Sequence, residues 1–577
     1  MTESKRENKN GNKGENKTED RAGFGGPLYR KLREYGESDY YGFHMPGHKR
    51  QLGYFENPYK FDITEIDGFD DLHHPEKDGV LTRAQERAAG LYGAEETHFL
   101  VGGSTAGILS AISGCARRGG RILMARNCHR SVYHAAELGG LEAEYLYPQQ
   151  IASPGINGPV LPEDVERALA ENVAFSEQEK GRYAREAAGR FQAVVITSPT
   201  YDGICSDVRA IAKICHRHEV PLIVDQAHGA HFPFSDYFPE DAVSAGADVV
   251  IHSVHKTLPS LTQTALLHIQ GRLADRERIR HFLSVYQSSS PSYILMASID
   301  ACMELLETKG EALFREHAQL LESFREGCRD LEALRLYGAE RAPYFDCSKL
   351  LIATERAGIT GGRLSGLLLE RYHLQLEMSA PDYAVGIASI ADTESGFARL
   401  NRALHELDRE LAEGSRQGRE KEKTWMDAGR LSSGGLPRPR AALTAGEALE
   451  REKESRPLSK CAGRLAGAYV YLYPPGIPLL VPGEEITEQA IGRIEKWLAA
   501  GFPVHGLASH RARLRTELTE NRNGKIILSD RKKLYGKGYD FSEPAGAGGS
   551  GTETPGTLYD APHAGRRDAG RPVSFYG

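Results

Sequence analysis

Between about residues 80 and 300, the sequence alternates short apolar segments with longer segments of helical periodicity. This alternation is typical of a mostly parallel β-sheet flanked by helices, because parallel strands need a crossover connection between them. It constrains the fold more than any other feature of the chain. It predicts six strands, which cover Glu96–Val101, Arg121–Ala125, Ala193–Thr197, Pro221–Val224, Asp248–Ile251 and Thr264–His268.

A lysine directly follows one of these strands, in the segment A-D-V-V-I-H-S-V-H-K-T-L at residues 247–258. Lysines are usually solvated on polar surfaces. Lys256 instead comes just after the buried run Val249 to Ile251, with Ser253 and His255 beside it. The segment alone favours a lysine that only caps a strand, but two further strand ends upstream fit the same site and indicate a reactive amine.

A carboxylate follows the preceding predicted strand, Pro221–Val224. In open α/β sheets ligands bind at the carboxyl ends of strands, and a buried aspartate there needs a cationic or hydrogen-bonding partner. The protonated pyridine nitrogen of pyridoxal phosphate is one such partner. Asp225 precedes Lys256 by 31 residues, which leaves room for one helix and one strand. Two adjacent strand ends are therefore predicted to place both residues at one cofactor.

The strand Glu96–Val101 runs into the turn G-G-S-T at residues 102–105 and then into a helix of small and apolar residues. Glycines let the backbone approach an anion, and a helix N-terminus supplies free N–H groups. The turn lacks the lysine of nucleotide-binding P-loops, so it suits a single phosphate, with added hydroxyls from Ser104 and Thr105. His129, after the next strand, is a candidate to stack on a cofactor ring. A structural turn and a surface histidine are the alternatives for these two features.

Composition excludes several other classes of protein. The 577 residues are 40% hydrophobic and 26% charged, and the formal charge of −7 gives no electrostatic reason to expect nucleic acid. No apolar run reaches the length of a membrane helix, and the N-terminus lacks the apolar segment of a secretory signal. The eight cysteines are scattered without a C-x-x-C, which is typical of a reducing cytosol. We therefore expect a cytoplasmic protein.

The chain divides into seven predicted regions. Charged, Gly-rich or Pro-rich composition marks tails and a linker, where few apolar residues are available to form a core. A short amphipathic helix is expected at residues 27–36. The regions are a disordered tail (1–22), an N-terminal segment (23–80), a large cofactor-binding domain (81–300), a small subdomain (301–413), a linker or insert (414–456), a C-terminal domain (457–535) and a second disordered tail (536–577).

Six motifs occur in order and together resemble the bacterial-type ornithine/lysine/arginine decarboxylase family. Besides S-x-H-K after a strand, D-x-A-H-G-A-H, the G-x-S-T turn and N-C-H-R-S, the chain carries F-H-M-P-G-H-K (Phe43–Lys49) and Y-P-P-G-I-P-L-L-V-P-G-E (Tyr473–Glu484). The similarity covers about residues 25–410 and 457–510. It resembles the shorter, biosynthetic branch, because only about 20 residues precede the first predicted helix and no receiver-like domain is expected there.

The resemblance implies the fold of aspartate aminotransferase, fold type I of the pyridoxal-phosphate enzymes. That fold has a large domain with a mostly parallel, seven-stranded sheet and a smaller α/β region, here followed by a small C-terminal α+β domain. Lys256 would carry the cofactor as a Schiff base, and Asp225 would pair with the pyridine nitrogen. Ala227 would lie against the ring, on which His129 would stack. The phosphate would be held by Ser104, Thr105, Ser253 and His255.

The segment Gln287–Tyr293 matches a family stretch that reaches the phosphate of a neighbouring subunit, with Ser289 as the chosen contact. The resemblance thus implies a homodimer, or a higher homo-oligomer, with shared active sites. The chain departs from common family residues at Gly103, Gln226 and Val254, and the first two could alter hydrogen bonds around the phosphate and ring.

The implied reaction is decarboxylation of a basic amino acid, with arginine favoured over lysine and ornithine, to an amine that feeds polyamine synthesis. The catalytic residues would be Lys256, Asp225 and His255, with Lys256 or His255 protonating Cα. A cationic substrate also needs an acidic partner. The candidates are Asp67, Asp70, Asp71, Glu377, Glu484 and Glu485.

Three other functions are compatible with parts of the sequence. An aminotransferase or lyase could use the same cofactor and fold, because fold does not fix the reaction. A decarboxylase-like chain could also act as a non-catalytic partner, although Lys256 and Asp225 argue against this. A metal-dependent hydrolase is weakly suggested by histidine pairs, but Pro46-Gly47 interrupts one of them and no third ligand has a diagnostic spacing. The pairs are His44 with His48, His73 with His74, His228 with His231 and His252 with His255.

Overall fold

The computed structural model describes residues 31–32, 35–51, 58, 62–63, 66–178, 189–338, 344–416, 435–473, 476–508 and 525–527. The chain divides into two units, residues 1–530 and 531–577, and every described residue belongs to the first. The two predicted disordered tails and most of the predicted helix at residues 27–36 lie outside the described residues. In the described part, no helix combines the length and apolarity needed to cross a membrane.

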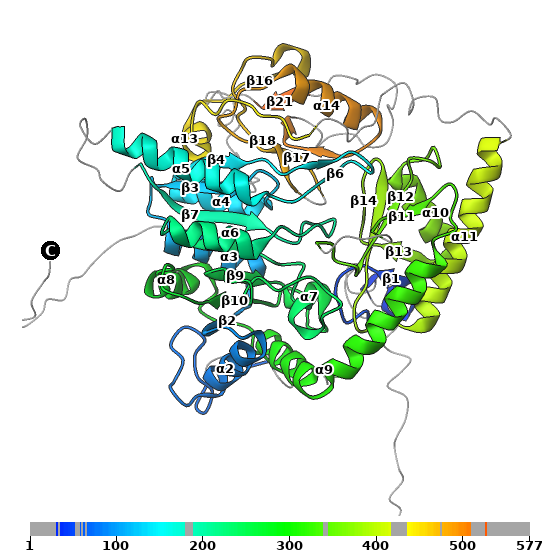
Figure 1. Ribbon diagram of the computed structural model, residues 1–577, viewed down its shortest axis with the longest axis horizontal. Helices are drawn as coiled ribbons and strands as arrows, with labels where there is room; N and C mark the ends of the chain where they lie inside the picture. Colours follow the sequence, from blue (N-terminus) through cyan, green and yellow to red (C-terminus); the bar gives the residue numbers. More distant parts are fainter. Residues whose placement is uncertain are drawn as a thin grey trace, which may run out of the picture. The chain divides into compact units, whose positions relative to one another are not determined.

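A seven-stranded sheet forms the centre of the large domain (Figure 1). Only β10 is antiparallel to its neighbours in this sheet, and the other pairings are parallel. The six predicted strands are all present, with ends shifted by two residues at most, and the predicted fold class is confirmed. The strand order is β2 (Glu96–Leu100), β10 (Ala265–Ile269), β9 (Val249–His252), β8 (Leu222–Asp225), β7 (Phe191–Thr197), β3 (Arg121–Ala125) and β4 (Glu142–Leu146).

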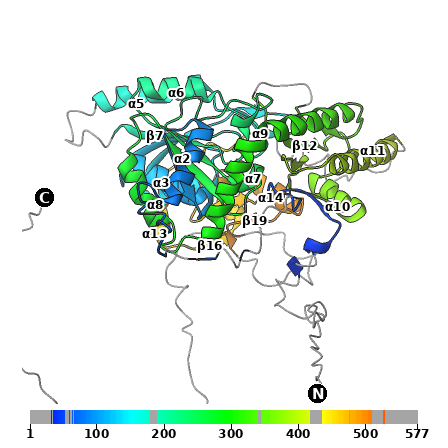
Figure 2. The same cartoon turned by 90° about the horizontal axis from the view of Figure 1, so that it is seen from below.

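Helices cover both faces of this sheet, as Figure 2 shows for α5 and α6 on one face and α3 and α8 on the other. The central strands β8 and β9 are buried along their whole length, which explains their uninterrupted apolar sequences. These helices are α3 (Gly103–Cys115), α5 (Pro162–Gln178), α6 (Val208–Arg217) and α8 (Arg276–Tyr286), with α2 (Val80–Tyr92) and α4 (Arg130–Gly139) completing the large domain.

The long helix α9 (Tyr293–Gly327) leads from the large domain into a small subdomain. The residue 300/301 boundary expected from the sequence therefore falls inside one continuous helix. The subdomain has a four-stranded sheet in the order β11 (Arg335–Leu336), β12 (Lys349–Ala353), β15 (Tyr383–Ile387) and β14 (Met378–Ser379). It also contains α10 (Gly361–Tyr372), α11 (Glu394–Arg416) and a parallel pair made of β1 (Tyr41–Phe43) and β13 (Leu374–Leu376).

The C-terminal region has its own apolar core, which includes Leu458, Leu480, Ile486 and Ile494. Two small three-stranded sheets and α14 surround this core, and α13 lies within the segment that the sequence suggested as a linker. The elements are α13 (Ala445–Glu450), β16 (Ser455–Pro457), β17 (Val470–Leu472), β18 (Pro478–Leu480), α14 (Glu488–Ala499), β19 (Val504–His505), β20 (Leu507–Ala508) and β21 (Lys525–Ile527).

A buried ion pair joins this region to the large domain. Arg126, just after β3, lies 3.2 Å from Glu484, and both side chains are almost fully buried. The same guanidinium donates to the carbonyls of Pro478 and Leu479 and to the Tyr133 hydroxyl. Glu484 also accepts a hydrogen bond from the Val481 backbone, so each charge is paired inside the protein, while Arg126 Nε and Glu484 Oε1 have no hydrogen-bond partner among the described residues.

Candidate active site

Three strands end at the same edge of the large sheet. β8 and β9 are parallel neighbours, and β2 runs in the same direction because both β2 and β9 pair antiparallel with β10. Asp225 is the last residue of β8. Ser253 follows β9 and is the N-cap of the short helix α7 (Val254–Thr257), which carries Lys256. The sheet therefore brings Asp225, Lys256 and the turn after β2 together, as predicted from the strand ends.

Asp225 is 4% exposed and accepts one hydrogen bond, from the Ala227 backbone at 3.2 Å. Burial raises the pKa of this carboxyl, and the nearby Lys256 ammonium lowers it. A buried carboxylate with so few donors is stabilised by a further cation. The protonated nitrogen of a pyridine ring between Asp225 and Lys256 would meet this need.

The N-terminus of α3 has the properties of a phosphate site. Its N-cap is Gly102, which offers no side-chain cap, and its first turn contains no acidic residue. The hydroxyl oxygens of Ser104 and Ser253 lie 2.6 Å apart, so residues from two strand ends meet here. Gly103 has a φ of +71°, which favours glycine at this turn. These donors fit the phosphate group of pyridoxal phosphate.

Two histidines near Lys256 are neutral, because burial lowers the pKa of His129 to about 3 and that of His255 to about 4. His255 Nδ1 lies 2.7 Å from the Thr264 carbonyl, which can only accept, so Nδ1 carries the proton and neutral Nε2 is an acceptor. A phosphate contact through His255 Nε2 therefore requires the protonated ring. His129 Nδ1 accepts from the Ser131 backbone at the start of α4.

Sequence reasoning missed two residues that contact the predicted reactive amine. His228 Nε2 lies 3.0 Å from Lys256 Nζ, and His228 Nδ1 lies 2.9 Å from Lys349 Nζ. The D-x-A-H motif contained His228, but only as one of several histidines. Lys349 opens β12 in the small subdomain, 93 residues beyond Lys256, and nothing in its local sequence indicates this contact.

Of the six candidate acids for substrate binding, Glu377 is the one that acts electrostatically on Lys256. Its oxygens accept from the Met45 backbone at 2.9 Å and from the Tyr201 hydroxyl at 2.5 Å. Asp70 and Glu484 have structural roles instead: Asp70 accepts from the backbone of Leu81 and Thr82 at the start of α2, and Glu484 pairs with Arg126. These contacts occupy both carboxylates and favour Glu377 over them.

The remaining candidates also lack a link to Lys256. Asp71 accepts hydrogen bonds from the His73 backbone and the His74 ring, and Asp67 is exposed. Glu485 is joined to Arg440 through its backbone. Among the described residues, no group of three or more His, Cys, Asp or Glu side chains could hold a metal ion.

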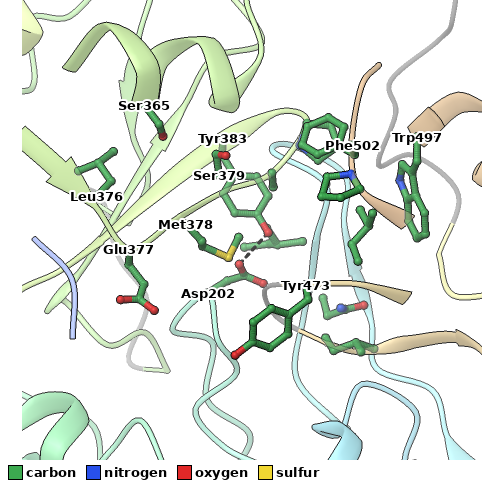
Figure 3. Close-up of a pocket in the computed structure, with 18 of the residues that line it drawn as sticks. Asp202, Ser365, Leu376, Glu377, Met378, Ser379, Tyr383, Tyr473, Trp497 and Phe502 are labelled. Carbon is green, nitrogen blue, oxygen red and sulfur yellow. Dashed lines mark hydrogen bonds between the residues drawn. The ribbon is translucent and has the colours of Figure 1, made fainter. Parts of the chain in front are cut away.

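A pocket of about 500 Å³ opens beside Glu377. Figure 3 shows Glu377 and Trp497 on opposite sides of this pocket, with Asp202, Met378 and Tyr473 between them. The Tyr383 hydroxyl donates to Asp202 at 2.7 Å. The pocket is thus lined by residues of the large domain, the small subdomain and the C-terminal region.

Comparison with known proteins identifies the family of this chain. Residues 26–352 match the major domain of Orn/Lys/Arg decarboxylases, and residues 437–500 match the C-terminal domain of the same family. The chain is 32% identical to an arginine decarboxylase of Bacillus subtilis (strain 168), over 83% of this chain and 95% of that relative. It is 25% identical to a lysine decarboxylase of Pseudomonas aeruginosa, over 81% of this chain and 75% of that relative.

Comparison with solved structures finds the same fold in a lysine decarboxylase. Lysine decarboxylase A from Pseudomonas aeruginosa superposes with a TM-score of 0.68 and 22% sequence identity, covering 87% of this chain and 80% of that structure. The major-domain match alone spans more than half of the chain, and the strand-end residues fit the cofactor that the motifs predicted. The chain therefore belongs to the Orn/Lys/Arg decarboxylase family and is a carboxy-lyase that uses pyridoxal 5′-phosphate.

Proposed function

We propose that this enzyme decarboxylates arginine to the corresponding amine, with lysine and ornithine as poorer substrates, and that the amine enters polyamine synthesis in the cytoplasm. The observation that carries the proposal is that Lys256, at the edge of the large sheet, is acted on by the charges of Asp225, from the same edge, and of Glu377, from the small subdomain. The identity to a Bacillus subtilis arginine decarboxylase over 95% of that relative supports the choice of arginine.

The strand-end residues would hold the cofactor in the following way. Lys256 would bind its aldehyde carbon covalently, Asp225 would pair with the ring nitrogen, and Ala227 and His129 would flank the ring. Ser104, Thr105, Ser253 and His255 would surround the phosphate. When bound, pyridoxal phosphate supplies a ring that takes up the electrons left behind as CO₂ departs.

Lys256 is the better candidate for the proton donor to the substrate Cα. The proton on His255 Nδ1 is held by the Thr264 carbonyl, and the ring has a pKa of about 4, so few His255 rings carry a second proton at neutral pH. Lys256 Nζ lies at the end of a flexible side chain and has a hydrogen-bond partner in His228. An amine in this position can receive a proton and deliver it.

Glu377 would bind the cationic end of the substrate side chain. It lies near Lys256 and lines the 500 Å³ pocket, which offers space for a long side chain beyond the reacting centre. A guanidinium group would also fit a carboxylate well, because its N–H donors can form two parallel hydrogen bonds.

We expect a Glu377→Gln variant to lose about 10- to 10²-fold in kcat/KM for arginine, because a hydrogen bond to a charged group contributes about 1.5–3 kcal/mol. The measurement is a panel of arginine, lysine and ornithine with detection of CO₂ and the amine product. A matched control is Glu410→Gln, since Glu410 pairs with Arg371 on an exposed surface of the small subdomain. Equal activity of Glu377→Gln and wild type on all three substrates would show that another acid binds the side chain.

We also propose a homodimer, or a higher homo-oligomer, in which Ser289 reaches the phosphate site of the partner subunit. Ser289 lies in an exposed segment between α8 and α9, where the Ser288 carbonyl contacts the His73 ring. Exposed apolar side chains occur on both sides of this segment, at Phe69 and Val285, and a partner subunit would cover them.

Light scattering of the full-length chain is expected to give at least twice the 63.5 kDa mass of one chain, and a Val285→Asp variant is expected to dissociate. Leu138→Asp, at an exposed leucine of α4, is the matched control and should leave the mass unchanged. A wild-type mass of a single chain at active concentrations would contradict the shared active site.

A further inference from the structure

The imidazole of His228 lies between two lysines that come from different parts of the fold. Lys256 Nζ is 3.0 Å from Nε2, and Lys349 Nζ is 2.9 Å from Nδ1. His228 is 5% exposed and Lys349 is fully buried. The ring of Tyr201 packs edge-on against His228 at 4.8 Å between centroids, which fixes the orientation of the imidazole.

The chemistry of the His228 imidazole limits how many of its two lysine neighbours, Lys256 and Lys349, can be protonated. Burial and the two lysines lower the pKa of His228 well below its ordinary value, so the ring is neutral. A neutral imidazole has one N–H donor and one acceptor nitrogen, whereas an ammonium group can only donate. If both hydrogen bonds are present, the lysine that faces the imidazole N–H is a neutral amine that accepts from it, so only the other lysine, which donates to the ring, can be an ammonium.

The surrounding charges favour Lys349 as the ammonium. Asp346 lies near Lys349, and it stays ionised because His231, Lys349 and Ser348 hold its pKa at about 2. On the other side, the acids that act on Lys256 are Asp225 and Glu377, and burial raises the pKa of Asp225. The other charged or titratable groups that act on the three residues are Lys49, Asp202, His129 and His255.

We propose that Lys256, His228 and Lys349 share one ammonium proton, which resides on Lys349 and leaves Lys256 as a neutral, nucleophilic amine. This inference rests on the proposed role of Lys256 and extends it to two further residues. His228 would donate from Nε2 to Lys256 and accept at Nδ1 from Lys349. A shift of both protons along these two hydrogen bonds would protonate Lys256 and neutralise Lys349, so that Lys256 could deliver a proton to the substrate. Lys349 is thus a positioning residue that acts through His228.

The test uses the full-length chain after removal of the cofactor and measures acetylation of each lysine by acetic anhydride as a function of pH. The reagent transfers an acetyl group to a neutral amine, and acetate and the amine proton are released. Mass spectrometry then gives a titration midpoint for each site. In the wild type, we expect the midpoint of Lys256 to lie well below that of the exposed Lys213, which serves as an internal reference.

Lys349→Met should raise the Lys256 midpoint by about one pH unit, which corresponds to a roughly tenfold slower acetylation below the midpoint. The matched control is Lys49→Met, which removes another buried lysine that donates to the carbonyls of His44 and Ile387 rather than to His228. Because Lys49 acts on Lys349 only through its charge and makes no hydrogen bond to His228, this variant should shift the Lys256 midpoint far less than Lys349→Met does. A purely structural role of Lys349 would lower activity without this shift.

An unchanged midpoint in Lys349→Met, or an equal shift in Lys49→Met, would overturn the proposal. If Lys349→Met does not fold, the wild-type profile still decides, because equal midpoints for Lys256 and Lys213 exclude a shared proton. The labelling result is independent of the substrate panel. An enzyme that decarboxylates arginine but shows no shift disproves only the shared proton, whereas failure on every amino acid disproves only the proposed reaction.

Discussion

A Lys256→Ala variant is expected to lose decarboxylase activity by at least about 10⁴-fold, as enzymes do when the nucleophile is removed. Lys256 is the lysine at the strand end that faces Asp225, and alanine offers no amine for covalent attachment of the cofactor. The activity assay should be paired with borohydride reduction and mass spectrometry, which detect the attached cofactor in the wild type only.

Lys213→Ala is the matched control, because Lys213 is an exposed lysine of α6 on the large domain. It should retain wild-type rates and the attached cofactor. Full decarboxylation by Lys256→Ala with bound cofactor would show that another residue is the nucleophile. Loss of activity in Lys213→Ala as well would point to an unstable protein, which circular dichroism of both variants would reveal.

The largest expected loss of stability comes from Arg126→Met. This change leaves the buried Glu484 carboxylate without its cation and removes the donors to the Pro478 and Leu479 carbonyls. Breaking a buried pair by removing one partner typically costs about 3–5 kcal/mol. We expect the free energy of unfolding of the C-terminal region to fall by this amount in urea, followed by the fluorescence of Trp497 in a Trp425→Phe background.

Two further variants test whether the loss of stability comes from the unpaired buried charge rather than from the removal of any arginine. Arg126→Met combined with Glu484→Met removes both charges and should recover most of the lost stability, because no buried charge remains unpaired. Arg209→Ala breaks an exposed pair with Glu240 and should cost no more than about 1 kcal/mol. A loss as small for Arg126→Met as for Arg209→Ala would mean that water reaches Glu484.

The central sheet could be predicted because its strands are buried on both faces and are therefore continuous apolar runs. β8 and β9 follow this rule along their whole length, and their ends correctly placed Asp225 near Lys256. β4 was missed because its sequence E-A-E-Y-L interrupts the apolar run with two glutamates, and most of the strand is not buried because it lies at the edge of the sheet.

The contacts between distant segments could not be predicted in the same way. Lys349 and Glu377 reach the site from the small subdomain, and their positions depend on how two domains pack rather than on local sequence. Glu484 follows a proline-rich turn and was a plausible substrate ligand from its sequence. The structure pairs it instead with Arg126, a contact that the local sequence does not indicate. The roles of all the predicted site residues remain predictions, namely those of Lys256, Asp225, His255, Ala227, His129, Ser104, Thr105, Ser253 and Ser289.

The helix α9 fixes the geometry of the two lysines at both of its ends. Near its start, the Ser298 hydroxyl contacts Ser260, four residues after Lys256, and in its last turn Arg325 donates to the backbone carbonyl of Lys349. Insertion of a single residue into an α-helix rotates everything beyond it by about 100° and advances it by about 1.5 Å. The length of α9 therefore determines the position of Lys349 relative to Lys256. Insertions or deletions in α9 would move the two lysines apart, so we expect them to be tolerated less than in a helix that only connects two domains.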